Sequence, residues 1–99
     1  MNKQSKQLEK AAFILKSIAH PTRLAAIDYL NKKGQASVGE ICAATGCEQS
    51  LMSHHLIAMK LKGILQSQKE GTSILYSLKE KQLCMVIQLI DQCNCNMGA

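Results

Sequence analysis

The spacing of apolar residues along this 99-residue chain predicts helices over most of its length and strands over one short stretch. Apolar positions that recur every three to four residues indicate amphipathic helices, whereas strict alternation indicates a half-buried strand. Alternation around a Gly-containing tip at 69–72 predicts a β-hairpin over 64–78. Helical spacing covers residues 2–19, 22–32, 37–45, 49–62 and 79–93. We therefore expect a single domain over 1–99 that is mainly α-helical, with a small hairpin between the fourth and fifth helices.

The two terminal helices are apolar on more than one side. In the first, a stripe at helical spacing comprises Leu8, Ala11, Ala12, Leu15, Ile18 and Ala19. Phe13 and Ile14 lie off that stripe, and the last helix is apolar around most of its circumference. A helix with two apolar sides packs against two surfaces, so we expect the terminal helices to form a homodimer interface as well as to cover their own core. The alternative is that Phe13 and Ile14 merely pack beneath the last helix.

The centre of the chain has the pattern of a helix-turn-helix. Ser37 and Glu40 fit a capping box that starts the first helix, and Gly46 provides the break after it. In the second helix the inner stripe is Met52, Leu56 and Met59, and the outer positions are Gln49, Ser50, Ser53 and His54. The second helix of such a motif lies in the major groove of DNA, where small polar side chains can reach base edges. The pattern therefore predicts DNA binding by these outer residues.

The hairpin follows the second of these helices directly, as the wing of a winged helix-turn-helix does. Lys69 and Thr72 lie at its predicted tip, where they could reach an adjacent minor groove or a phosphate. Lys60, near the end of the preceding helix, is a further candidate for phosphate contact. The alternative is a plain hairpin that only completes the core, and the two interpretations are compatible.

The positive charge of the chain favours a polyanionic partner. The formal net charge is +5 and the isoelectric point is about 9.1, and of the twelve lysines and arginines only Arg23 is an arginine. Lysine acts as a point charge on phosphates, whereas arginine makes bidentate contacts to guanine. We therefore expect lysines to hold the DNA backbone and base readout to proceed without arginine.

The sequence also argues against several other classes of protein. No run approaches the ~18 apolar residues of a membrane span, and the first ten residues lack the apolar segment of a secretory signal. We therefore expect a cytoplasmic protein without membrane contact, whose five cysteines are mostly reduced thiols. No Gly-rich phosphate loop, HExxH or GxSxG motif is present, so an enzyme is not expected.

Two short motifs carry a resemblance to a known family. They are Ala-His-Pro-x-Arg at 19–23 and Ser-x-His-Leu at 53–56, within longer similar segments at 15–30, 37–65 and 68–78. On these segments the chain resembles the ArsR/SmtB family of winged-helix repressors. The resemblance implies a homodimer that binds inverted repeats and releases DNA when an inducer binds, often a metal or metalloid ion.

The resemblance also implies roles for residues of the fourth predicted helix. It places four side chains at DNA: Gln49, Ser50, Ser53 and His54. It implies that His55 is tucked toward the core and hydrogen-bonded. Family members commonly have arginine where this chain has His54, so guanine readout lacks its usual side chain here. They often have serine where this chain has Glu48, whose carboxylate suits the helix dipole but repels phosphates, so we expect Glu48 to lower non-specific affinity.

The metal sites of the family can be compared with this chain position by position. One version has a Cys-x-Cys pair at the start of the helix-turn-helix, where residues 37–39 here read Ser-Val-Gly. Another has four ligands along the last helix, and the matching positions here are Glu80, Gln82, Cys93 and Asn96. Only Glu80 and Cys93 are good ligands for a divalent ion, so we do not expect a zinc or cobalt site of that kind.

Thiols late in the chain are the remaining candidates for a signal. Cys93 and Cys95 form a soft pair suited to arsenite, cadmium, copper(I) or mercury if the helix has ended there. Cys84 could join them only across an antiparallel pair of helices in a dimer, which would also suit a redox or sulfur signal. Cys42 and Cys47 are expected to pack as small hydrophobes. The fold itself is expected to need no cofactor.

Three alternatives stay open at this point. The cysteines could be incidental, in a family member that senses no metal. The chain could be a soft-metal-binding thiol protein whose DNA motif is vestigial. It could also be a winged helix that binds another protein through its terminal helices.

Overall fold

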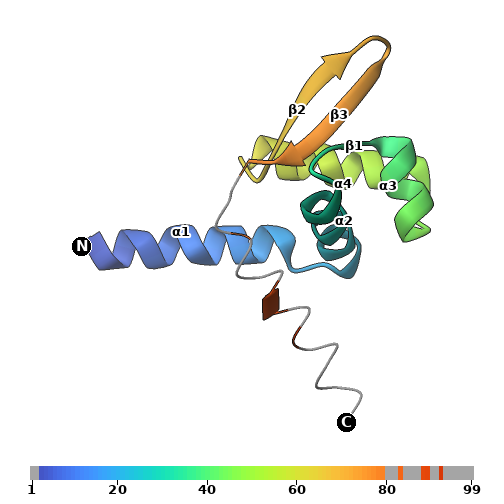
Figure 1. Ribbon diagram of the computed structural model, residues 1–99. Coiled ribbons are helices and arrows are strands. Elements are labelled where there is room, and N and C mark those ends of the chain that lie inside the picture. Colours follow the sequence, from blue (N-terminus) through green and yellow to red (C-terminus); the bar gives the residue numbers. More distant parts are fainter. Residues whose placement is uncertain (1–2, 80–82, 84–87, 90–91, 93–99) are drawn as a thin grey trace.

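The computed structural model describes residues 3–79, 83, 88–89 and 92, and Figure 1 shows how their helices and strands are arranged. The elements in chain order are α1 (Lys3–Ile18), α2 (Pro21–Lys33), β1 (Ala36–Ser37), α3 (Val38–Thr45), α4 (Gln49–Leu61), β2 (Leu65–Glu70) and β3 (Ser73–Leu78). The bounds of α1 to α4 lie within one residue of their predicted positions, and β2 and β3 form the predicted hairpin. Most of the helix predicted over 79–93 lies outside the described residues.

Both ends of the hairpin differ slightly from the prediction. Lys79, expected as the first residue of the last helix, is not helical and instead donates its N–H to Ile64 O at 2.9 Å. At the other end Lys69 and Glu70 are paired with β3, so only Gly71 and Thr72 form the turn. Gly71 has a φ of +61°, the positive value that a two-residue hairpin turn needs at its first position. The paired strands of the hairpin therefore extend further toward the tip than the sequence pattern indicated, and the turn between them is tighter.

The sheet also contains a strand that the sequence pattern did not predict. β1 pairs antiparallel with β3 through Ala36↔Tyr76 and Ser37↔Leu75, which gives the strand order β1-β3-β2. Two residues are too few to show an alternating pattern, so periodicity cannot reveal such a strand. Because α3 begins at the next residue, Val38, β1 ties the hairpin to the start of the helix-turn-helix.

Ser37 also forms the predicted capping box. Its Oγ accepts a hydrogen bond from the Glu40 N–H at 3.2 Å, and the Glu40 carboxylate accepts one from the Ser37 N–H at 3.0 Å. These hydrogen bonds, chiefly the one from the Ser37 backbone, lower the pKa of Glu40. At the other end of α3, Gly46 has the left-handed φ of +77° that ends the helix. The predicted start and end of the first motif helix are thus both confirmed.

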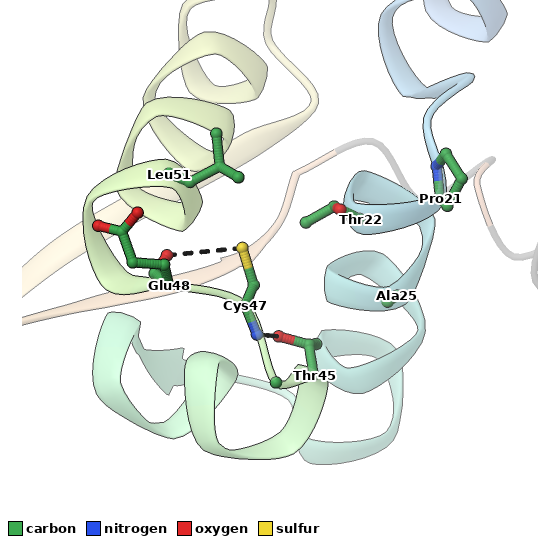
Figure 2. Close-up of a pocket in the computed structure, with 8 residues that line it drawn as sticks. Pro21, Thr22, Ala25, Thr45, Cys47, Glu48 and Leu51 are labelled. Atoms are coloured by element: carbon green, nitrogen blue, oxygen red, sulfur yellow. Dashed lines mark hydrogen bonds between the residues drawn. The ribbon is translucent and has the colours of Figure 1, made fainter.

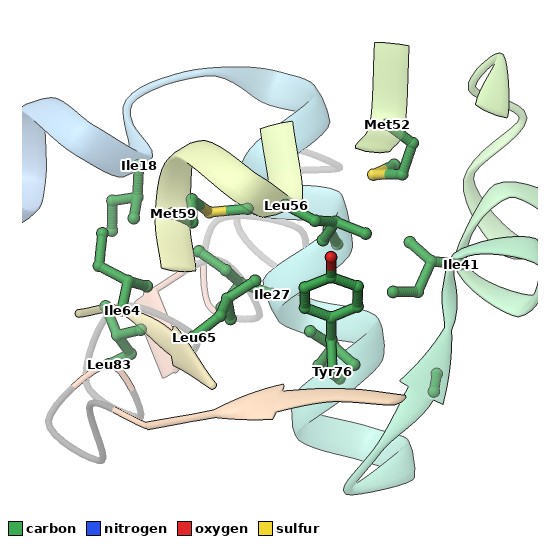
Figure 3. Close-up of a cluster of buried hydrophobic side chains, with 13 residues drawn as sticks. Ile18, Ile27, Ile41, Met52, Leu56, Met59, Ile64, Leu65, Tyr76 and Leu83 are labelled. Carbon is green, nitrogen blue, oxygen red and sulfur yellow. The ribbon is translucent and has the colours of Figure 1, made fainter. Parts of the chain in front are cut away.

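A single hydrophobic core joins the helices to the sheet (Figure 3). Ile27 from α2, Ile41 from α3 and Leu56 from α4 are completely buried. Leu65 from β2 and Tyr76 from β3 belong to the same cluster. All three residues of the predicted inner stripe of α4 are buried, as expected. The hairpin therefore completes the core, and close packing fixes the base of the hairpin relative to α4.

The inner face of α1 differs from the prediction. Of the predicted stripe only Ile18 is buried, whereas Leu8 is 63% and Leu15 54% exposed. Ile14, which lies off that stripe, packs against the core instead. Figure 1 shows the reason: α1 extends away from the other helices, so only its last turns reach the core. At 16 residues α1 is the longest helix described, and within the described ranges no helix is long and apolar enough to cross a bilayer.

Candidate nucleic-acid interface

Helix α4 has two very different faces. Its buried side consists of Met52, His55, Leu56 and Met59. Its opposite side carries the residues predicted to meet DNA, of which Gln49, Ser50 and His54 are exposed and Ser53 is half-buried. Helical residues four apart lie above one another, so Ser50 and His54 align along the axis with Ser53 beside them. The structure therefore gathers Ser50, Ser53 and His54 on one side, with the exposed Gln49 at the N-terminal end of the helix, and we call these four residues the outer face of α4.

Glu48 caps the first turn of α4. Its carboxylate accepts one hydrogen bond from the Ser50 N–H at 3.2 Å and another from the Ser50 hydroxyl. The negative charge also offsets the positive end of the helix dipole. The Ser50 hydroxyl therefore takes part in the cap of α4 while its side chain lies on the exposed side of the helix. The sequence pattern did not predict this contact, although a carboxylate just before a helix is a recognised capping signal.

The buried face of α4 is tied to α2 by the single arginine of the chain. Arg23 Nε donates to His55 Nδ1 at 2.9 Å, and Arg23 Nη1 donates to the backbone oxygen of Ser17 at 2.7 Å. The His20 ring lies next to the His55 ring, with 4.5 Å between their centroids. The Ala-His-Pro-x-Arg and Ser-x-His-Leu motifs therefore meet in space. Sequence reasoning missed this contact, which directs the half-buried guanidinium toward the buried face of α4 and not toward the outer face.

The environment of His55 favours its neutral form. Burial lowers the pKa of His55, and the positive charges of Arg23, His20 and His54 lower it further. Only a neutral imidazole has a lone pair at Nδ1 that can accept the hydrogen bond from Arg23. His55 is 6% exposed, so it is tucked toward the core and hydrogen-bonded, as the resemblance implied.

His54 diverges from this cluster. Its ring centroid is 6.1 Å from that of His55, and its side chain is exposed. Neighbouring helical residues are rotated by about 100°, so the two rings do not converge on one ion. In the part of the chain that the structure describes, no three His, Cys, Asp or Glu side chains gather into a metal site.

The predicted phosphate contacts lie at two places around the outer face. Lys60 is exposed in the last turn of α4. Lys69 in β2 and Thr72 in the turn are exposed near the tip of the hairpin, which projects beyond the helices in Figure 1. Since the base of the hairpin is packed into the core, these side chains have a defined position relative to α4. The geometry is that of a recognition helix with an adjacent wing.

A depression of about 500 Å³ lies between the start of α2 and the turn of the helix-turn-helix (Figure 2). Cys47 lines it, with its Sγ directed to Glu48 O at 3.5 Å and its N–H donating to Thr45 Oγ1 at 3.4 Å. Cys42 is also half-buried against the core, and burial raises the pKa of its thiol, with smaller contributions from Cys47 and Glu48. Both cysteines thus pack as small side chains around the turn, as predicted. Cys84, Cys93 and Cys95 lie outside the described residues.

Several known proteins are similar to this chain in sequence and in fold. The family model for "Bacterial regulatory protein, arsR family" matches residues 20–67. Over 87 residues the chain is 34% identical to the HTH-type transcriptional regulator YgaV of Escherichia coli strain K12, covering 88% of each protein. The crystal structure of the transcriptional repressor PagR of Bacillus anthracis aligns with a TM-score of 0.78 and 32% identity, over 87% of this chain and 98% of that one. A homodimeric winged helix-turn-helix DNA-binding domain from Mycobacterium bovis aligns with a TM-score of 0.77 and 25% identity, over 98% and 89% of the two chains.

The fold, the exposed outer face and these relatives define a DNA-binding transcriptional regulator and not an enzyme. The chain belongs to the ArsR family of such regulators. This confirms the resemblance and the class of function expected from the sequence.

Proposed function

We propose that this protein is a repressor that binds an inverted-repeat operator as a homodimer. The division of α4 carries the proposal, because one face is fixed by the core and by Arg23 while the other presents polar side chains to solvent. A two-fold dimer presents two such helices to successive major grooves, about 34–36 Å apart. Relatives named as a repressor and as a homodimeric DNA-binding domain support the same arrangement.

In this proposal the outer face of α4 reads bases in the major groove. Gln49 has the amide that pairs with the N6 and N7 atoms of adenine. The hydroxyls of Ser50 and Ser53 can each donate to or accept from a base edge. His54 replaces the arginine common in the family, so discrimination at its position should differ from the usual choice of guanine.

The lysines supply the sequence-independent part of the affinity. Lys60 flanks the groove contact at the end of α4, and Lys69 with Thr72 reaches the backbone or an adjacent minor groove from the wing. Each phosphate that a lysine neutralises contributes about −0.9 to the slope of log K against log salt concentration. DNA binding should therefore weaken steeply with salt.

The test begins with an operator selected from a random duplex library by the purified protein. Ser53→Ala and His54→Ala should each reduce the preference for the operator over bulk DNA by roughly fivefold to a hundredfold. Lys69→Ala should weaken binding to all sequences alike and reduce the salt slope by about one. Lys32→Ala is the matched control, because Lys32 is ion-paired to Asp28 at 3.1 Å on α2. Binding that ignores both sequence and salt would contradict the proposal.

The dimer part of the proposal rests on apolar side chains that the monomer leaves exposed. On α1 these are Leu8, Phe13 and Leu15, between 50% and 63% exposed, and Leu89 is 58% exposed. Exposed apolar side chains on two sides of a helix that extends from its own domain are typical of an oligomer interface. A second copy of the chain is the proposed occupant, since relatives of this fold include a homodimer.

Sedimentation equilibrium tests the dimer directly. Phe13→Glu and Leu15→Glu should shift the protein to a monomer, because each would bury a charge in the interface. Leu61→Glu is the control, since Leu61 is 83% exposed on α4 and belongs to the proposed DNA side. A wild-type monomer at micromolar concentration would contradict this part of the proposal.

The release signal is proposed on the chemistry of the sequence alone. Cys93 and Cys95, with Cys84 as a further thiol, would bind a thiophilic metal or metalloid ion or react with a thiol-modifying signal. Operator binding is to be measured with arsenite, cadmium, zinc, copper(I), peroxide and polysulfide. Loss of the response in a Cys93→Ser/Cys95→Ser double variant supports thiol sensing. A double variant that responds like the wild type would contradict thiol sensing by Cys93 and Cys95.

A further inference from the structure

Helix α4 has three exposed apolar side chains, Leu51, Ile57 and Leu61, and Ile57 is the one that directly follows the polar residues of the outer face. Ile57 is 50% exposed, although the residues on either side of it in the chain, Leu56 and Ala58, are buried and half-buried. It follows Ser53 by four residues and His54 by three, which places it on the same side of the helix as both. The polar outer face thus continues directly into a branched apolar side chain.

The surroundings of Ile57 favour a polyanion over an apolar protein surface. His54 precedes it on the outer face and the exposed Lys60 follows it, so the exposed apolar surface around Ile57 extends only to Leu61, one turn further on. A protein-binding site would require a larger continuous apolar patch. The major groove, by contrast, offers isolated apolar groups, because the C5 methyl of thymine is the single apolar group that base pairs present there.

We propose that Ile57 is a specificity-determining residue that contacts a thymine methyl group in each half of the operator. This inference rests on the proposed DNA binding by the outer face of α4 and adds to it the base that this position prefers. With a rise of 1.5 Å per residue, Ile57 lies about 4.5 Å beyond His54 and 6 Å beyond Ser53 along the helix. Base pairs are 3.4 Å apart, so the thymine lies one or two steps from the pairs that those residues meet.

Leu61 provides a matched comparison on the same helix. It is apolar, 83% exposed, and one turn beyond Ile57 toward the end of α4. Recognition helices contact base edges mainly with their N-terminal residues. Leu61 is the last residue of α4 and lies one turn further from those residues than Ile57, so its truncation should leave base preference unchanged.

The test replaces single thymines of the selected operator by deoxyuridine, which removes only the methyl group. In the wild type, one symmetry-related thymine should show a penalty of roughly fourfold in Kd per half-site, the value of about 0.8 kcal/mol for one buried methyl. Ile57→Ala should bind the thymine and deoxyuridine operators equally well. Ile57→Val should keep most of the penalty, and Leu61→Ala should keep all of it. Thermal unfolding of each variant verifies that its fold is intact.

Three results would overturn the inference. They are a wild type that is insensitive to every deoxyuridine, an Ile57→Ala variant that keeps the full penalty, and a Leu61→Ala variant that loses it. Each is compatible with sequence-specific binding through Ser53 and His54, so the proposed function would stand. Failure to select any operator, in contrast, would remove the proposed function first and this inference with it.

Discussion

His54 and His55 are adjacent in the chain, yet they belong to two regions with opposite constraints. His55 is 6% exposed, accepts a hydrogen bond from Arg23 and contacts the His20 ring. His54 is exposed and lies on the outer face of α4. The inner face of the helix is therefore determined by contacts within the protein, whereas the side chain of His54 faces solvent. The comparison teaches that stability and specificity can be altered separately in this helix.

The largest expected difference between the two faces concerns stability. Leu56→Ala should lower the free energy of unfolding by about 2–5 kcal/mol, because the fully buried leucine leaves a cavity. Ile57→Ala, one residue further, should change it by no more than about 0.5 kcal/mol, as at other exposed positions. Urea unfolding at a fixed protein concentration measures both. Equal losses for the two variants would mean that the two faces are not distinct.

The next effect concerns the arginine that holds the inner face. Arg23→Gln should destabilise the protein by about 1–3 kcal/mol, because it leaves His55 Nδ1 and the Ser17 oxygen without their donor. Lys32→Gln breaks an exposed ion pair to Asp28 and should cost under about 1 kcal/mol. Thermal unfolding of the two variants, compared at one concentration, tests the difference. If Arg23→Gln were as stable as Lys32→Gln, the motif contact would have no structural role.

A smaller effect should appear as a dependence of stability on pH. An unfolded histidine titrates near pH 6.5, and burial beside Arg23 lowers the pKa of His55 in the folded state. Below pH 6.5 the unfolded chain therefore binds a proton that the folded protein does not. The free energy of unfolding should therefore decrease as the pH is lowered from 6.5 to the lowered pKa of His55. Above pH 6.5 this contribution should be constant.

His55→Asn isolates that contribution, because the asparagine oxygen can accept from Arg23 without titrating. The variant should be less stable than the wild type at pH 7.5, yet its stability should change less between pH 7.5 and pH 5.5. His54→Asn on the outer face should retain most of the wild-type pH dependence, because His54 is the smallest of the four causes that lower the pKa of His55. Chemical denaturation at several pH values measures all three proteins, and an unchanged slope in His55→Asn would assign the effect to another group.

The smallest expected effect concerns Glu48, which lies at the boundary between the two faces. Glu48→Gln should raise the affinity for bulk DNA by roughly twofold to threefold at low salt, because a charge that repels phosphates is removed. The glutamine oxygen can still accept from the Ser50 N–H, so the cap is preserved. The gain should vanish at high salt, and titrations at two ionic strengths measure it. A gain that is independent of salt would assign the effect to a change in contacts.

The helices and their caps could be predicted because their signals are local. Ser37, Glu40 and Gly46 lie within ten residues of one another, and each fulfils a requirement of one helix end. The direction of α1 could not be predicted in this way. Periodicity shows which residues share a face, but whether Leu15 or Ile14 meets the core depends on how the helix leaves the domain.

The contacts that define the interface required the fold. Arg23 and His55 are 32 residues apart, and no spacing rule joins them. β1 is too short to have a pattern, and its partner β3 lies far along the chain. Ile57 presented a different difficulty: an isoleucine in a helix is usually read as core, and only its exposure shows that it faces outward.

Ser37 has a consequence for the shape of DNA that this protein can accommodate. The residue pairs with β3 as part of β1 and caps α3 as well, so the hairpin and the helix-turn-helix are joined without an intervening flexible loop. With the wing contacting DNA as proposed, the separation between its contact and that of α4 is fixed by the protein. Sequences that narrow the groove or bend the duplex to match this separation should then bind more tightly, even at base pairs that no side chain touches.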